Sequence, residues 1–401
     1  MKSISEPLYL TAGEAARELS VSPATLYAYV SRGLVRSEPL PDSRQKRYRA
    51  EDVRALKNRR APFAASGRGP DGEMPVLDSA VSTITEAGPL YRGVHAVALA
   101  RDATLEQVAT LLWDANGADP FAPGNLPVMS DAMRAVAGAT AAQPPLVRAI
   151  AVTALAGNAD PKALNRSADG RAGVAGRVMR LVAASILGTE PAAQPLHRQV
   201  AEAWKPGDAT ARNLVRRALV LLADHELNAS TYTLRCAAST GLNLYDQAIA
   251  GLVALKGPRH GGAGPLAARL VAELAAGDAA RLIADKVATG ERIPGFGHVI
   301  YRQGDPRAAD LLAALVAAGA GQRLAVEVPA AITEATGLHP NIDFAVAVMV
   351  HALGLPAGHE IALFAIARTA GWMAHGIEQM HGGALIRPRA RYTGPAPART
   401  E

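Results

Sequence analysis

The chain has 401 residues, of which 49% are hydrophobic and 19% are charged, and its formal net charge is +6. This composition excludes a disordered chain, and the length allows two or three domains around a large buried core. The single cysteine, Cys236, excludes an internal disulfide and a cysteine-based metal cluster.

The charge is concentrated at the N-terminus, where residues 1–60 hold 12 Lys and Arg against 7 Asp and Glu, a net +5. A polyanionic partner is therefore expected only for this part of the chain. The first ten residues contain Glu6 and Pro7 and lack an apolar signal core, so we expect a cytoplasmic protein.

Residues 9–57 predict two helices followed by a pair of short strands. Thr11 and Glu14 form a capping-box pattern at the start of the first helix, and Ser22 precedes Pro23 as the N-cap of the second. The stretch LVRSEPLPDSRQKRYR predicts two strands around a Pro-Asp-Ser tip, and AEDVRALKNRR predicts a further helix.

This pattern resembles the winged helix-turn-helix of the MerR and excisionase-like families. The resemblance implies duplex DNA as a partner of residues 1–60, although the Tyr-Ala-Tyr at 27–29 departs from the MerR pattern. The wing would contact phosphates through Arg44, Lys46, Arg47 and Arg49, and the second helix would contact bases through Thr25, Tyr27 and Tyr29. The alternative is a small basic oligomerisation or docking module.

Residues 61–75 are rich in Gly, Pro, Ser and Ala, which predicts a linker. Beyond it, stretches such as LEQVATLLW and GPLAARLVAELAAG repeat apolar residues at helical spacing, and strand alternation is absent. We therefore expect an all-α domain over residues 76–401. Its longest apolar region, residues 344–367, is interrupted by His351, Pro356 and Glu360, which predicts a buried helix pair and no membrane span.

Polar residues gather in stretches of this domain where a core would not select them. These stretches are LADHELNAST (222–231), KGPRHGGAG (256–264), GFGHVIYRQGDPR (295–307), NIDFAVAVMVHALGLP (341–356) and FAIARTAGWMAHGIEQMHGGALIRPRARYTG (364–394). Their histidines and arginines can move protons near neutral pH and bind anions. Gly295 and Gly297 allow a sharp turn and the close approach of a ligand.

In order and spacing these stretches resemble the successive motifs of the citrate synthase family, over about residues 75–394. The resemblance implies an all-α fold of a large and a small helical subdomain behind the winged helix-turn-helix. It also implies an acyltransferase that condenses oxaloacetate with acetyl-CoA to give citrate and CoA, with no permanently bound cofactor and no metal. A 2-methylcitrate synthase would use propionyl-CoA, and one methylene is worth only ~1–3 kcal/mol, so the acyl donor stays open.

The condensation needs a base for a C–H proton, a donor to the thioester oxygen, a group to polarise the acceptor carbonyl, and cations for carboxylates. By resemblance, Asp343 is the base, His260 is the donor to the thioester, and His298 lies at the oxo-acid carbonyl. The substrate-binding residues that the resemblance implies are His225, Arg307, Arg368 and, from the partner subunit of a homodimer, Arg387. The CoA-binding residues it implies are Pro294, Gly295, Gly297 and Arg302, the last of which is equally a surface arginine.

A second hypothesis is a DNA-binding regulator whose synthase-like domain senses a CoA ester or an oxo-acid. The complete set of His260, His298 and Asp343 favours catalysis, because a pure sensor needs the arginines but not the base. The basic N-terminal region favours regulation.

Overall fold

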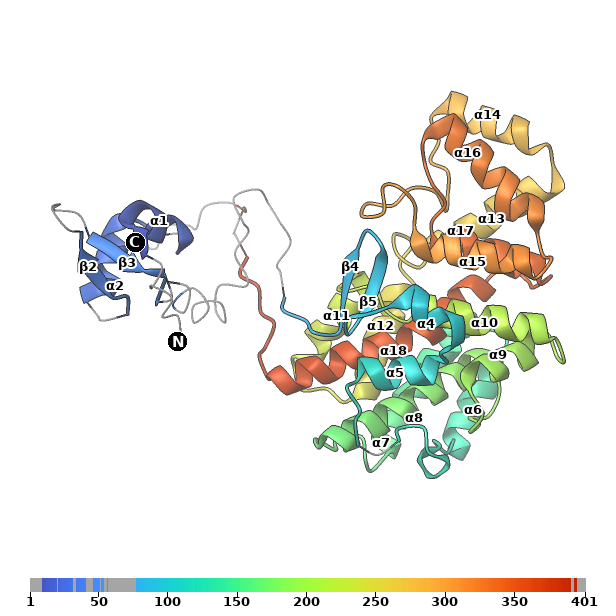
Figure 1. The fold of residues 1–401 in the computed structure, drawn as a ribbon. Coiled ribbons are helices and arrows are strands. Elements are labelled where there is room, and N and C mark those ends of the chain that lie inside the picture. The colour runs from blue at the N-terminus through green and yellow to red at the C-terminus, as the bar shows by residue number, and fades with distance from the viewer. Residues whose placement is uncertain are drawn as a thin grey trace, which may run out of the picture. The chain divides into compact units, whose positions relative to one another are not determined.

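The computed structural model describes residues 9–19, 21–31, 34–40, 46–50, 52, 53, 56, 77–117, 119–390, 393 and 394. The chain forms two compact units, the first of Met1–Asp78 with Arg387–Glu401 and the second of Ser79–Ile386 (Figure 1). The predicted linker and Arg44 lie outside the described residues.

The described part of the first unit includes two helices with complete bounds and a three-stranded sheet, and residues 50, 52, 53 and 56 are also helical. Its elements are β1 Tyr9–Thr11, α1 Ala12–Glu18, α2 Pro23–Ser31, β2 Ser37–Pro39 and β3 Lys46–Arg49. The predicted capping box is present at Thr11, and Ser22 Oγ accepts a hydrogen bond from the Thr25 N–H at 3.2 Å. The strands pair antiparallel in the order β1-β3-β2, so the predicted wing strands gain a third neighbour.

The second unit begins with an antiparallel sheet of β4 Ser82–Thr85, β5 Gly88–Tyr91 and β6 Val94–His95. The sequence pattern predicts no strand here. Two to four residues are too few to show an alternating pattern, and the turns depend on Gly88 and Gly93, whose φ angles are +109° and +82°.

The helices of this unit form a larger and a smaller lobe (Figure 1). The larger lobe contains α4 Ala96–Asp102, α5 Leu105–Leu112, η1 Pro123–Asn125, α6 Asp131–Ala139, α7 Pro145–Ala159, α8 Ala168–Leu187, α9 Leu196–Trp204, α10 Ala209–Leu222, α11 Ala229–Ala238, α12 Leu244–Leu255 and α18 His359–Gly382. The smaller lobe contains α13 Ala263–Ala276, α14 Ala279–Thr289, α15 Pro306–Ala317, η2 Arg323–Glu327, α16 Val328–Thr336 and α17 Ile342–Ala352.

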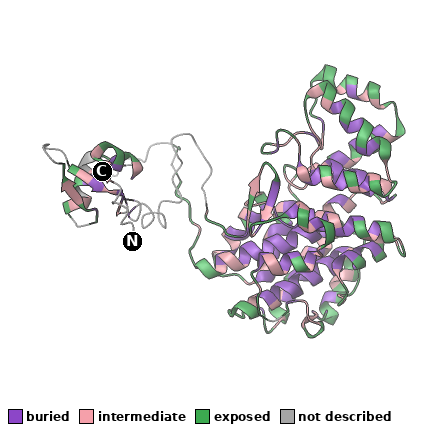
Figure 2. Cartoon of the chain, viewed as in Figure 1, coloured by how far each residue is buried: buried purple, intermediate pink, exposed green. Residues whose placement is uncertain are grey.

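Helix α18 is the buried axis of the larger lobe (Figure 2). Its Trp372 is fully buried, and a Cβ on Gly251 of α12 would come within 2.8 Å of the Trp372 ring, so only glycine allows this approach. The predicted helix pair of residues 344–367 is confirmed as most of α17 and the start of α18. Among the described residues, the helices are too short or too polar to cross a membrane.

Candidate active site

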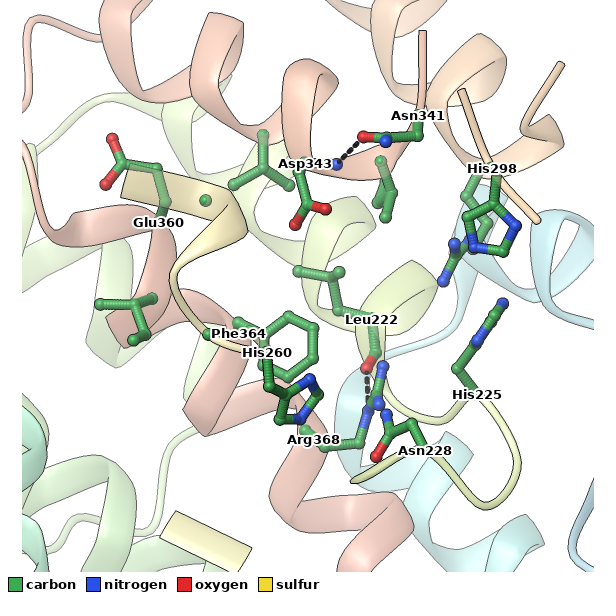
Figure 3. Close-up of a pocket in the computed structure, with 16 residues that line it drawn as sticks. Leu222, His225, Asn228, His260, His298, Asn341, Asp343, Glu360, Phe364 and Arg368 are labelled. Atoms are coloured by element: carbon green, nitrogen blue, oxygen red, sulfur yellow. Dashed lines mark hydrogen bonds between the residues drawn. The ribbon is translucent and has the colours of Figure 1, made fainter. Parts of the chain in front are cut away.

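A cavity of about 190 Å³ lies between the two lobes (Figure 3). All the polar stretches singled out in the sequence contribute to it, from helices α10, α13, α15, α17 and α18 and from the loops that precede α11, α13, α15 and α17. Its lining residues are Leu222, His225, Asn228, His260, Gly261, Gly264, His298, Arg307, Asn341, Ile342, Asp343, Val346, Glu360, Ile361, Phe364 and Arg368.

The loop that contains Gly295 and Gly297, called the glycine loop below, fixes the start of α17. Gly295 and Gly297 have φ angles of +81° and +77°, which glycine adopts without strain. The Gly295 carbonyl accepts the Asn341 N–H at 2.8 Å, and the Gly297 carbonyl accepts the Asn341 side-chain N–H at 3.0 Å. Asn341 in turn caps α17, because its Oδ1 accepts the Asp343 N–H at 3.0 Å. The loop therefore determines where Asp343 lies.

The Asp343 carboxylate points into the cavity (Figure 3). Burial raises the pKa of this carboxyl, while the positive charges of Arg307 and Arg368 act in the opposite direction. Because the effect of burial is the largest of these, the Asp343 carboxylate is a stronger base than an exposed one.

Arg307 is held by Asp305, a residue that sequence reasoning missed. The Arg307 Nη2 lies 2.8 Å from Asp305 Oδ2 and its Nε lies 3.0 Å from Oδ1, and both side chains are buried. Asp305 Oδ2 also accepts the Ile342 N–H at 3.0 Å, so one carboxylate holds both the arginine and the start of α17. The Asp-Pro pair at the start of a helix was the available signal, because it marks an N-cap.

His298 is held by backbone groups of its own loop. Its Nδ1 accepts the N–H groups of Ile300 and Tyr301 at 3.1 and 3.3 Å. Burial and the charge of Arg307 lower the pKa of this histidine, so the ring is neutral and carries its proton on Nε2. His298 is thus a hydrogen-bond donor through Nε2.

His260 lies against a buried serine and a buried tryptophan. Its Nε2 is 2.8 Å from Ser230 Oγ, which also accepts the Trp372 indole N–H at 3.2 Å. Burial, assisted by the charge of Arg368, lowers the pKa of His260 to about 4, so the ring is neutral at physiological pH. Ser230 was another residue that sequence reasoning missed.

Arg368 is a buried cation with spare hydrogen-bonding capacity. Its Nε donates to the Leu222 carbonyl at 2.9 Å, and its guanidinium lies 4.5 Å from the centre of the Phe364 ring. Among the described residues, its buried Nη1 has no hydrogen-bond partner. A buried N–H group on a cation that lines a cavity indicates an anionic ligand.

Comparison with known proteins identifies the family. Residues 72–389 match the family model described as the C-terminal domain of citrate synthase, and residues 10–62 match that of MerR helix-turn-helix regulatory proteins. The chain belongs to the citrate synthase family.

Curated citrate synthases and 2-methylcitrate synthases are among the relatives. The chain is 40% identical over 186 residues to citrate synthase 2 of Bacillus subtilis, covering 45% of this chain and 50% of that protein. It is 37% identical over 186 residues to the 2-methylcitrate synthase of Shewanella oneidensis, with the same shares covered. The chain thus spans about half the length of the curated relatives it matches.

Solved citrate synthases share the fold. The enzyme from Pyrobaculum aerophilum superimposes with a TM-score of 0.69 at 24% identity, covering 83% of this chain and 96% of that chain. A structure of the Thermoplasma acidophilum enzyme, described as a ternary complex with carboxymethyl coenzyme A and oxaloacetate, gives 0.66 at 24% identity, covering 82% and 96%. The predicted all-α citrate synthase fold is confirmed.

The cavity of this citrate synthase family member does not include every residue predicted for the site. His225, His260, His298, Arg307, Asp343 and Arg368 line it, whereas Pro294, Gly295, Gly297 and Arg302 are not among the described residues that do. Arg302 is exposed. Arg387 is also exposed and follows α18 in the C-terminal segment, which belongs to the first compact unit.

Proposed function

We propose that this protein condenses oxaloacetate with an acyl-CoA thioester and hydrolyses the product thioester to release CoA. The observation that carries the proposal is the buried Arg368, which lines the same cavity as Asp343 and two neutral histidines and whose Nη1 has no hydrogen-bond partner among the described residues. The names of the relatives support it, as does the Thermoplasma acidophilum enzyme, which is described in complex with oxaloacetate and a CoA analogue.

In the proposed reaction Asp343 takes a proton from the α-carbon of the thioester while His260 donates a hydrogen bond to the thioester oxygen. The enol carbon then forms a bond to the keto carbon of oxaloacetate. The keto π electrons move to the oxygen, which takes a proton from His298 Nε2. Water attacks the thioester carbonyl and gives a proton back to His298, the C–S bond breaks, and the CoA thiolate takes the proton held by Asp343 and leaves as the thiol.

Two arginines and a histidine bind the oxo-acid in this proposal. Arg307 is already paired with Asp305 through Nε and Nη2, and this pairing orients the guanidinium. Its other N–H groups stay available for a ligand. Arg368 offers its Nη1 to a second carboxylate, and His225 lines the same cavity. Acetyl-CoA is the proposed acyl donor, with propionyl-CoA as the close alternative.

CoA binding and assembly are further parts of the proposal. The backbone of Pro294, Gly295 and Gly297 contacts CoA, and Arg302 binds a CoA phosphate from its exposed position. Arg387 of one subunit completes the cavity of its partner in a homodimer. No permanently bound cofactor is proposed, and the cytoplasm is the proposed location.

Duplex DNA is the proposed partner of residues 1–60, supported by the match to MerR regulatory proteins. Arg47 and Arg49 lie 3.3 and 3.7 Å from the carboxylate of Glu38, which partly neutralises them, so exposed Lys46 is the stronger phosphate contact. Thr25 is engaged with Ser22, whereas Tyr27 is 55% exposed and is therefore the better base contact. The proposed domain boundaries are 1–60, a linker at 61–75, and 76–401.

The test of the enzymatic proposal is thiol release from a panel of acetyl-, propionyl- and butyryl-CoA, each with and without oxaloacetate. We expect CoA release only when both substrates are present, and its loss in His260→Ala. His351→Ala is the matched control, because His351 is exposed on α17 outside the cavity. If the protein binds oxaloacetate but releases CoA from none of the thioesters, the proposed catalysis is contradicted and a ligand-sensing regulator is favoured.

A further inference from the structure

Tyr301 contacts three of the residues proposed to bind the oxo-acid, although it is not among the cavity-lining residues. It is only 3% exposed. Its ring stacks on the His298 ring with centroids 4.6 Å apart, and the Arg307 guanidinium lies 5.4 Å from its centre. Its hydroxyl lies 3.1 Å from His225 Nε2. One buried aromatic side chain therefore joins the separate elements of the site.

The position of the protons between Tyr301 and His225 follows from their surroundings. Burial raises the pKa of Tyr301 to about 12, so the hydroxyl keeps its proton. Burial and the charges of Arg307 and Arg368 lower the pKa of His225, so its ring is neutral. Among the described residues, the Tyr301 hydroxyl has no hydrogen-bond partner other than His225.

If His225 Nε2–H donated to the hydroxyl, the buried hydroxyl proton would have no acceptor among the described residues, so the hydroxyl donates to His225 Nε2. The proton of the neutral imidazole then lies on Nδ1, which makes His225 a donor toward a ligand. The opposite tautomer would present a lone pair on Nδ1, a poor match for the anion that Arg307 and Arg368 attract into the same cavity.

The same residue also fixes His298. The backbone N–H of Tyr301 is one of the two that bind His298 Nδ1, and its ring covers one face of the imidazole. The rings of His225 and His298 lie 5.5 Å apart at an interplanar angle of 87°, so their free nitrogens are directed differently. Two donors held in this way can reach two oxygen atoms of one small ligand.

We propose that Tyr301 is a positioning residue that holds His225 through its hydroxyl and His298 through its ring, so that both donate to one bound oxo-acid. This inference rests on the proposed function of the cavity. The role is distinct from packing alone, because the hydroxyl and the ring act on different histidines and can be removed separately.

Tyr301→Phe removes the hydroxyl and keeps the stacked ring. We expect the KM for oxaloacetate to rise about fivefold to tenfold, the value of one hydrogen bond, with kcat changed by less than about twofold. Tyr301→Leu removes the ring as well, and we expect kcat to fall a further tenfold or so because His298 loses its orientation. Calorimetric titration with oxaloacetate alone should show the same weakening for Tyr301→Phe.

Tyr245→Phe is the matched control, because the Tyr245 hydroxyl is also buried, donates to Asp160 at 2.8 Å and lies outside this cavity. It should leave the oxaloacetate KM unchanged. If wild-type protein is active and Tyr301→Phe binds oxaloacetate as tightly as wild type, the inference is overturned while the proposed function stands. If wild-type protein binds no oxaloacetate, both are overturned. Should Tyr301→Leu fail to fold, the Phe variant alone decides.

Discussion

Asp343 is the residue whose charge state the cavity controls most directly. Its carboxylate lies at the first turn of α17, where the helix dipole favours the anion, yet burial raises its pKa. The buried charge of Asp343 therefore costs stability that an uncharged side chain at this position would not cost. We interpret that cost as a consequence of its proposed role as a base.

Asp343→Asn should separate the proposed role of the carboxylate as a base from its cost in stability. We expect turnover to fall by about 100-fold or more, with calorimetric oxaloacetate affinity nearly unchanged, because the amide keeps the shape but cannot accept the proton. We expect the melting temperature to rise, since the asparagine has no charge to desolvate. A variant with full turnover would show that Asp343 is not the base.

The pH dependence should report the Asp343 carboxyl group and not His260. Activity should be lost as pH falls through the raised pKa of Asp343, so the acid limb of kcat/KM should lie above the ordinary Asp value of about 4. His260, with a pKa of about 4, should add no limb near ~6.5, the ordinary histidine value. A limb near ~6.5 that reflects His260 would contradict this.

The lowered pKa of His260 predicts how the free energy of unfolding changes with pH. Between ~6.5 and the folded value of about 4, the unfolded chain binds a proton at His260 that the folded chain does not. The free energy of unfolding should therefore decrease as pH falls through this window. Thermal melts of wild type and His260→Gln across that range should differ in slope, with the variant less sensitive to acid.

At the scale of elements, the glycine loop and α17 act as one piece. A Cβ on Gly295 would lie 2.7 Å from the Phe344 Cβ, so any side chain there would push against the helix that carries Asp343. Gly290, at the C-cap of α14, also has a positive φ of +67° but no atom within 4 Å of such a Cβ. Substitutions at these two glycines therefore distinguish the effect of backbone strain alone from the effect of displacing α17.

Gly290→Ala should cost about 1 kcal/mol of stability, the strain of a left-handed alanine, and leave activity unchanged. Gly295→Ala should cost about 2 kcal/mol or more and lower kcat about tenfold, because α17 must shift. Thermal unfolding and CoA release measured on both variants would check this. Equal activity in the two would mean that the loop does not position Asp343.

At the scale of the whole molecule, a small basic unit is joined to a much larger domain of the citrate synthase family. Five of the six net positive charges belong to residues 1–60. A homodimer would present two such units, so a twofold-related duplex is the expected target.

We expect the full-length protein to bind duplex DNA with strong salt dependence, each phosphate contact adding ~0.9 to the log–log slope. Lys46→Ala should reduce the slope by about one, whereas Lys162→Ala, an exposed lysine of the other unit, should not. Deletion of residues 1–60 should abolish binding and retain CoA release. Absence of binding to random duplex DNA at ~50 mM salt would contradict DNA binding and would indicate that residues 1–60 are a docking module.

The proposed contribution of Arg387 to a partner subunit can be tested by mixing. Neither Arg387→Ala nor His260→Ala should be active alone, but mixed dimers should regain activity because one of their two sites has both residues intact. The measurement is CoA release after subunit exchange. A fully active monomer at nanomolar concentration would contradict the shared site.

The sequence by itself determined the features that depend on neighbours along the chain. The Thr11 capping box, the Ser22 cap and the α17–α18 pair were all predicted, because capping and helical periodicity involve residues only a few positions apart. The order of the polar stretches was enough for the family resemblance, and through it for the residues predicted to share one site.

Tertiary structure alone decided which side chains support those residues. Tyr301 reaches His225 across 76 positions, and Trp372 reaches Ser230 beside His260 across 142 positions. The free energy that forms such contacts comes from packing of whole helices, and it leaves no periodic trace in the local sequence. The strands β4 to β6 were missed for a related reason, since very short strands depend on pairing with their neighbours rather than on their own pattern.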